Sequence, residues 1–148
     1  MFFTYLNSII IVSIFSVAMT TCSNTAQFHG GSIIPFPNVM TSYGMNSLED
    51  FRKTGKFLCE SPGLYLITAQ IMSYSKGAEY KISKNDIELT RVQITPYHDS
   101  DTHNYHTGTG IAVVELDVSD YVSVEILTRV KDVYIFGQES CLTIAKLK

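Results

Sequence analysis

The sequence of 148 residues has no tryptophan, only 3 cysteines and 4 prolines, and no cluster of basic residues. So few cysteines exclude a scaffold held together mainly by disulfides, and a chain of this length can bury a core without them. Its 14 acidic residues outnumber its 11 basic ones, so the electrostatic attraction that drives nucleic-acid binding is missing. Apolar and aromatic residues make up 45% of the chain, which excludes wholesale disorder. We therefore expect one folded domain that does not bind nucleic acid.

No aspartate, glutamate, lysine or arginine occurs before Glu49. Within this uncharged stretch, residues 9–18 form a short apolar segment that ends in small residues and precedes polar ones, as in a secretory signal peptide. The segment is too short to cross the roughly 30 Å hydrocarbon core of a bilayer. We predict a signal peptide at residues 1–18, with cleavage after Cys22 as the alternative, and a short N-terminal segment at residues 19–26. The protein is then secreted into the extracellular space without membrane insertion.

Secretion changes the interpretation of the cysteines. In an oxidising compartment Cys59 and Cys141 can pair, and we predict a disulfide between them. Cys22 is left over if cleavage follows Ala18, and it is removed if cleavage follows Cys22 itself. No two cysteines are spaced like a zinc knuckle, so they predict no metal site.

From Ile33 onward, apolar and polar residues alternate in segments separated by turn residues, which is typical of a β-sandwich or barrel. Residues 63–72 have apolar side chains on both faces of the expected strand, so this strand should lie at the centre of a sheet. The other expected strands are 33–36, 39–42, 78–83, 87–94, 111–116, 122–126, 133–136 and 142–147, with turns at 84–86, 117–120 and 137–139. A Ser-x-x-Asp pattern that begins at Ser47 predicts a single capped helical turn.

Polar and aromatic side chains are densest between residues 97 and 106, in an expected loop. Tyrosine and histidine rings can stack on a sugar or peptide, while carboxylates accept hydrogen bonds from it. The spacing of the histidines matches no standard zinc site, so we predict no metal and no cofactor, with calcium as an alternative because it prefers oxygen ligands. The candidate ligand-contact residues are Tyr97, His98, Asp99, Asp101, His103 and His106. If the histidines contribute, binding should weaken as the pH falls through about 6.5.

The sequence contains none of the common motifs of catalytic sites. The chain has no Gly-x-Ser-x-Gly nucleophile elbow, no His-Glu-x-x-His zinc motif and no phosphate-binding loop of the Walker type. The short run Gly108-Thr109-Gly110 opens an expected strand, so tight backbone packing explains it better than phosphate binding. We predict no catalytic residue and no enzymatic activity.

Several strings of the chain resemble, in order and spacing, the globular domain of the complement C1q family. They are residues 34–44 (IPFPNVMTSYG), 54–59, 62–65, 78–85, 108–116 and 120–122. Two features depart from the family pattern: Ser119 stands where the family usually has a glycine, and residues 142–147 replace the family's usual last strand. The resemblance covers residues 27–148, which we take as the C1q-like domain. It implies an all-β jelly-roll sandwich of about ten strands, shared with tumour necrosis factors, that assembles as a homotrimer.

This resemblance also implies a function. Relatives in the family serve innate immunity and extracellular signalling, so the chain is expected to be a secreted, non-enzymatic recognition protein. As a trimer it would bind glycans, microbial surfaces or protein ligands. The alternative is a structural protein of the extracellular matrix or of a mineral-associated layer, which the mild acidity of the chain permits without favouring.

Overall fold

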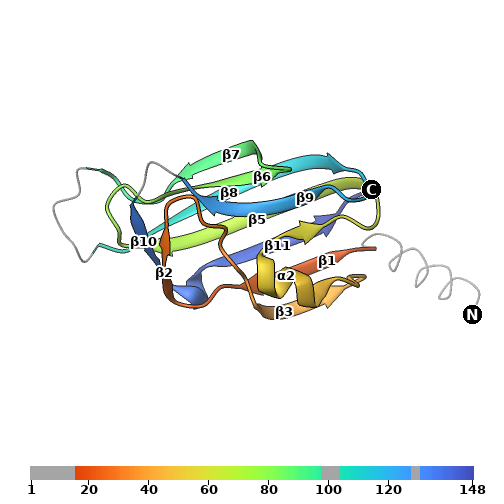
Figure 1. Cartoon of the computed structure of the whole chain (residues 1–148), viewed down its shortest axis with the longest axis horizontal. Coiled ribbons are helices and arrows are strands. Elements are labelled where there is room, and N and C mark those ends of the chain that lie inside the picture. The colour runs from red at the N-terminus through yellow and green to blue at the C-terminus, as the bar shows by residue number, and fades with distance from the viewer. Residues whose placement is uncertain (1–15, 98–103, 128–130) are drawn as a thin grey trace, which may run out of the picture.

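Two antiparallel β-sheets packed face to face make up the protein in the computed structural model, which describes residues 16–97, 104–127 and 131–148 (Figure 1). The elements are β1 (Ala18–Cys22), β2 (Ala26–His29), β3 (Asn38–Tyr43), α2 (Leu48–Thr54), β4 (Phe57–Leu58), β5 (Gly63–Ser73), β6 (Glu79–Lys84), β7 (Ile87–Gln93), β8 (His106–Leu116), β9 (Tyr121–Ile126), β10 (Asp132–Ile135), the 3₁₀ helix η1 (Gly137–Glu139) and β11 (Cys141–Lys146). The predicted all-β jelly-roll sandwich is confirmed.

In the first sheet the strand order is β3-β1-β11-β5-β8, with β10 and β2 joined to the end of β5. Strand β5 pairs with β8 along its whole length and with β11 on its other side. Its central position, which the apolar side chains on both faces predict, is therefore confirmed.

The second sheet has the order β4-β9-β6-β7. Residues 33–36, predicted as a strand, contribute to it only an isolated bridge between Ile33 and Glu125 and a 2.8 Å hydrogen bond from the Ile34 amide to the Val124 carbonyl. Pro35 and Pro37 have no amide hydrogen, so the ladder cannot continue in this segment. Its side chains still reach the core, because Ile34 and Phe36 are fully buried.

The core lies between the sheets and is made of the inward residues of each strand. On β5 these are Tyr65, Ile67, Ala69 and Ile71, all fully buried, and β6 and β9 contribute residues of the same kind from the opposite side. Because successive side chains of a strand point to opposite faces, the alternate residues of β5 point away from the core.

Glycines of β8 bring the two sheets close together. A Cβ atom added at Gly110 would lie 2.8 Å from a methyl group of Val92 on β7, and one at Gly108 would lie 2.7 Å from the other methyl group. The buried Tyr80 hydroxyl lies 2.8 Å from the Ala69 carbonyl oxygen and 3.0 Å from that of Gly108. The tight backbone packing predicted for this Gly-Thr-Gly run is therefore confirmed, and burial raises the pKa of the Tyr80 hydroxyl.

Helix α2 is longer than the predicted single turn, and its start is not capped as predicted. Ser47 occupies the N-cap position but makes no side-chain hydrogen bond to the helix. Burial of Phe51 anchors the helix instead, and the helix ends at Gly55, whose φ of 72° suits a residue without a Cβ.

The folded domain begins upstream of Gln27, where the family resemblance starts. Strand β1 lies inside the first sheet between β3 and β11, and Val17, Met19 and Thr21 are buried. Burial alternates along β1, as expected for a strand. In the sequence this alternation is hard to recognise, because β1 directly follows the apolar segment that predicts a signal peptide. Residues 19–26 are consequently part of the domain in this structure, and the first 15 residues lie outside the described part of the chain.

Candidate functional site

The predicted ligand-contact loop lies between β7 and β8. His98, Asp99, Asp101 and His103 fall outside the described residues, so the structure places only the two ends of the loop. At one end, the exposed Tyr97 ring packs on Gly77, where a Cβ atom would lie 2.5 Å from the ring. At the other end, His106 is half-buried and pairs with Ser73 at the end of β5.

Beside this loop lies an aromatic cluster that sequence reasoning did not identify: Tyr74, Tyr105, Tyr134 and Phe136. Neighbouring ring centroids are 5.1–6.0 Å apart, in tilted and edge-on arrangements that aromatic pairs prefer. Tyr134 alternates with the buried Val133 and Ile135, so its ring points away from the core. That alternation is visible in the sequence, but the meeting of the four rings depends on the pairing of β10 with β5.

The outer face of the first sheet is almost free of charge. Among its outward-facing residues on β3, β1, β11, β5 and β8, all within the described ranges, only Glu115 has a charged side chain. Ile111 and Val113 are 62% and 58% exposed at the centre of β8. The face comprises Asn38, Thr41, Tyr43, Ala18, Thr20, Cys22, Cys141, Thr143, Ala145, Leu64, Leu66, Thr68, Gln70, Met72, Thr107, Thr109, Ile111, Val113 and Glu115.

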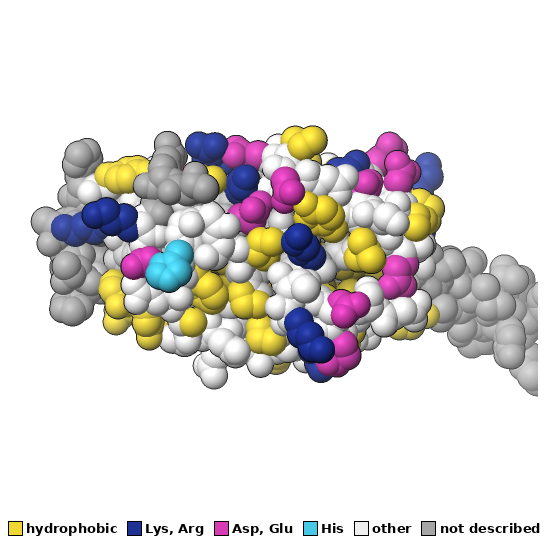
Figure 2. All heavy atoms as spheres, viewed as in Figure 1, with side chains coloured by type: hydrophobic (Ala, Val, Ile, Leu, Met, Phe, Trp, Pro, Cys, Tyr) yellow, Lys and Arg dark blue, Asp and Glu magenta, His cyan; other side chains and the backbone are white. Residues whose placement is uncertain are grey.

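The opposite side of the molecule has a different character. Figure 2 shows this side, where β9 and α2 face the viewer and basic and acidic side chains are interspersed. Arg91 and Glu88 on the second sheet lie 2.8 Å apart, and Arg52 donates a 3.0 Å hydrogen bond to Glu49 on α2. Solvated charges of both signs are typical of a surface that stays exposed, whereas an uncharged sheet face with large apolar side chains is typical of an interface.

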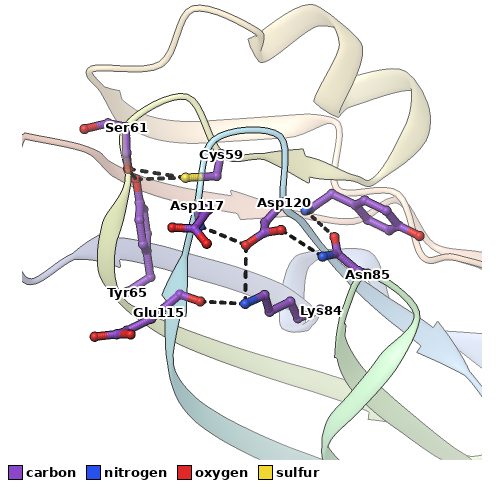
Figure 3. Close-up of polar contacts among 9 residues, drawn as sticks. Cys59, Ser61, Tyr65, Lys84, Asn85, Glu115, Asp117 and Asp120 are labelled. Carbon is purple, nitrogen blue, oxygen red and sulfur yellow. Dashed lines mark hydrogen bonds and ion pairs between the residues drawn. The ribbon is translucent and has the colours of Figure 1, made fainter.

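The disulfide predicted between Cys59 and Cys141 is wrong: Cys141 is bonded to Cys22, with an S–S distance of 2.07 Å. Cys22 and Cys141 are directly opposed on the neighbouring strands β1 and β11. Cys59 is a free thiol that is 1% exposed, and its Sγ lies 3.3 Å from the Ser61 carbonyl oxygen and 3.9 Å from the Tyr65 hydroxyl (Figure 3). Burial raises the pKa of the Tyr65 hydroxyl, so the phenol stays protonated and donates a hydrogen bond to Ser61.

A polar network joins the β6–β7 turn to the β8–β9 turn (Figure 3). Asp120 accepts a 2.8 Å hydrogen bond from the Asn85 side-chain amide and another of 2.8 Å from the Asp117 backbone amide, and Lys84 lies 3.3 Å away. Together these groups lower the pKa of the Asp120 carboxyl, with the Asn85 bond as the largest cause. Ser119, in the position where the family usually has glycine, has a φ of 76°, so the backbone there has the conformation that glycine adopts most easily. The network holds the two turns together.

Within the described ranges, no three side chains of His, Cys, Asp or Glu lie close enough together to hold a metal ion. In the same part of the chain, no helix has the length and hydropathy needed to span a membrane. What these residues offer chemically is surface for binding: an uncharged sheet face, an aromatic cluster and the ends of a polar loop.

Comparison with known proteins identifies the family. The sequence profile of the C1q domain matches residues 14–142. A comparison with curated proteins finds no match. Among solved structures, the globular domain of zebrafish complement 1qA protein shares 18% sequence identity with a TM-score of 0.66, over 88% of this chain and 96% of that chain. Eiger TNF from S. frugiperda shares 16% identity with a TM-score of 0.65, over 89% of this chain and 92% of that chain.

Murine APRIL at pH 5.0 shares 13% identity with a TM-score of 0.67, over 88% of this chain and 98% of that chain. At these identities the likeness to solved structures shows the jelly-roll fold alone. The C1q profile, however, covers most of the sequence, from upstream of β1 to the start of β11. The chain therefore belongs to the C1q domain family.

Proposed function

We propose that this protein is a secreted, non-enzymatic recognition protein that binds its ligands as a homotrimer. Domains of the C1q and tumour necrosis factor type are generally recognition or cytokine-like modules, are typically extracellular and generally form trimers. Membership of this family implies a ligand-binding domain of the same kind. The proposal goes beyond family membership in three respects: secretion, assembly as a trimer and the class of ligand.

The observation that carries the trimer is the uncharged outer face of the first sheet. Ile111 and Val113 are more than half exposed on this face. Their partners on β5, Thr68 and Leu66, are also uncharged, so no charged side chain next to them keeps the face solvated. Burying such side chains between subunits gains about 25 cal/mol for each Å² of apolar surface removed from water. A cyclic assembly that packs through β8 and β5 covers the exposed Ile111 and Val113 in every copy, and the charged side in Figure 2 stays in water.

The mass of the protein in solution tests the assembly. We expect light scattering coupled to size exclusion to give three times the chain mass for the secreted protein. Ile111→Glu combined with Val113→Glu should reduce this mass to that of one chain, because the charges would be buried without partners. Leu58→Glu is the matched control, since Leu58 is 43% exposed on β4 of the other sheet. A monomer at micromolar concentration, or a trimer that the double variant leaves intact, would contradict the assembly.

Ligand recognition is proposed for the surface of this trimer, with glycans, microbial surfaces or proteins as the ligand classes. Three linked sites raise the apparent affinity by about a hundredfold or more over a single site. The loop between β7 and β8 stays a candidate contact, with Tyr97 and His106 at its described ends. Measuring the binding of bacterial cells and glycans at pH 5 and pH 8 tests the histidines, because binding that depends on neutral imidazole weakens at the lower pH. Equal binding at both values would exclude a histidine contribution.

A further inference from the structure

A groove lies beside the disulfide, where the end of β1 meets β3 and η1. Its volume of about 570 Å³ is in the range of small-molecule sites. The described residues that line it are Cys22, Ser23, Asn24, Thr25, Asn38, Met40, Gly137 and Gln138. None of them has a charged side chain, so the groove suits a neutral ligand.

The walls of the groove are held in place by hydrogen bonds. The Asn38 side-chain amide donates bonds of 3.1 Å to the Ser23 carbonyl oxygen and 2.7 Å to the Asn24 side-chain oxygen. The Gly137 backbone amide donates a 2.9 Å bond to the Thr25 hydroxyl, and a Cβ atom at Gly137 would lie 2.4 Å from the Ser23 carbonyl oxygen. Backbone therefore packs directly on backbone at this point, and the disulfide fixes the end of β1 next to it. The groove is formed before a ligand arrives, which lowers the entropic cost of binding.

The hydrogen-bonding groups left over are amides. Asn38 donates within the wall through its NH₂ group, so its side-chain oxygen is available to accept a hydrogen bond from a ligand. Asn24 accepts within the wall through its side-chain oxygen, so its NH₂ group is available to donate one. Gln138 is exposed among the lining residues and adds a third carboxamide. Met40 is 69% exposed and supplies a flexible apolar side chain at the same groove.

This combination matches an acetamido group. Such a group has one N–H donor, one carbonyl acceptor and a methyl group, which pair with an amide acceptor, an amide donor and a thioether side chain respectively. Sugar hydroxyls both donate and accept, so they suit the Thr25 hydroxyl and the Gln138 carboxamide. An acidic sugar would lack a cationic partner among these residues.

The groove also remains open in the proposed assembly. Strand β3 is the edge of the first sheet farthest from β8, where Ile111 and Val113 lie. Each subunit of a trimer that packs through β8 and β5 thus keeps its own groove.

From these observations we propose that the groove binds a neutral N-acetylated sugar. The inference rests on the proposed recognition function and names one ligand class and one site for it.

Calorimetric titration of the intact trimer with N,N′-diacetylchitobiose tests the inference, with cellobiose as the matched sugar that lacks the acetamido groups. We expect chitobiose to bind at least tenfold more tightly than cellobiose. Asn24→Ala combined with Gln138→Ala should weaken chitobiose binding at least tenfold, because two hydrogen-bonding side chains are removed. Gln27→Ala, which removes an exposed glutamine of β2 outside the groove, should bind as the unchanged protein does.

Two further measurements separate the possible failures. The melting temperature of each variant and its mass without reductant establish that the fold and the disulfide are intact. Equal binding of the two sugars, or chitobiose binding unaffected by the double substitution, overturns the inference about the groove. Neither result affects the proposed assembly, which the mass of the protein tests, or the recognition of other ligands, which binding of bacterial cells and proteins tests.

Discussion

Cys22 and Cys141 face each other across the strands β1 and β11, with their Cα atoms 4.0 Å apart and their sulfur atoms bonded. The bond connects residues separated by 119 positions, near the beginning and the end of the folded domain. The bond thereby links β1 and β11, the first and last strands of the chain, which are neighbours in the first sheet. It lies beside the groove and on the uncharged face. Strand β1 is structurally tied to the domain by this bond as well as by its backbone ladder.

Replacement of Cys141 by serine should lower the free energy of unfolding by about 2–5 kcal/mol, because the unfolded chain loses the constraint of a long closed loop. Urea unfolding followed by circular dichroism measures the change. As a control, Cys59→Ala keeps the disulfide, and thiol titration of the denatured, unreduced protein should fall from one free thiol to none. Peptide mapping that linked Cys59 to Cys141 would contradict the pairing.

If the proposed secretion takes place, the N-terminus of the mature protein should lie at or before Val17. Cleavage after Ala18 would remove the buried Val17 side chain and the residue that begins β1, and cleavage after Cys22 would remove the whole strand with its disulfide. Mass spectrometry of the protein secreted by cells that express the full sequence identifies the first residue. A first residue of Met19 or Ser23 would refute the prediction, whereas a chain expressed from Ser23 onward should fail to form a stable trimer.

Gly110→Ala should destabilise the protein by about 1–3 kcal/mol, because its new methyl group would overlap the Val92 side chain on β7. Val92→Ala in the same chain removes that side chain's outer methyl groups, so the two substitutions together should cost less than the sum of their separate costs. Lys53→Ala, at an exposed position of α2, serves as the control and should change stability by about 0.5 kcal/mol or less. Strictly additive costs in chemical denaturation would show that the sheets are not in contact here.

Asp120 should stabilise the fold in a pH-dependent way. Its pKa is lowered in the folded state by the Asn85 hydrogen bond, the Asp117 amide and Lys84. The stabilisation is therefore complete above the unfolded value of about 4, and it is lost as the pH falls through the folded pKa. Asp120→Asn should reduce the melting temperature at pH 7, and the difference from the unchanged protein should shrink as the pH is lowered from 4 to 2. A difference that does not vary with pH would contradict an ionised Asp120 as its source.

Local patterns predicted much of the fold. Two-residue alternation located most strands of both sheets, and apolar residues on both faces of residues 63–72 identified β5 as central. The glycines at 108 and 110 indicated tight packing against the backbone of this strand before its neighbours were known. These predictions succeed because they depend on side-chain alternation and backbone freedom, which are properties of a few consecutive residues. Alternation alone fails at residues 33–36, since Pro35 and the following Pro37 leave too few backbone amides for a strand.

Residue patterns alone were enough to identify a β-sandwich with an uncharged beginning and a resemblance to the C1q domain. They did not reveal which cysteines pair, because the pairing depends on β1 and β11 becoming neighbours across 119 positions. The tertiary structure also settled the role of the uncharged beginning, since pairing of β1 with β3 on one side and β11 on the other makes residues 18–22 part of the first sheet. The aromatic cluster and the amide-lined groove arise in the same way, each from segments far apart in the chain. Pairing between distant strands is fixed by the packing of the whole sandwich, which no local pattern contains.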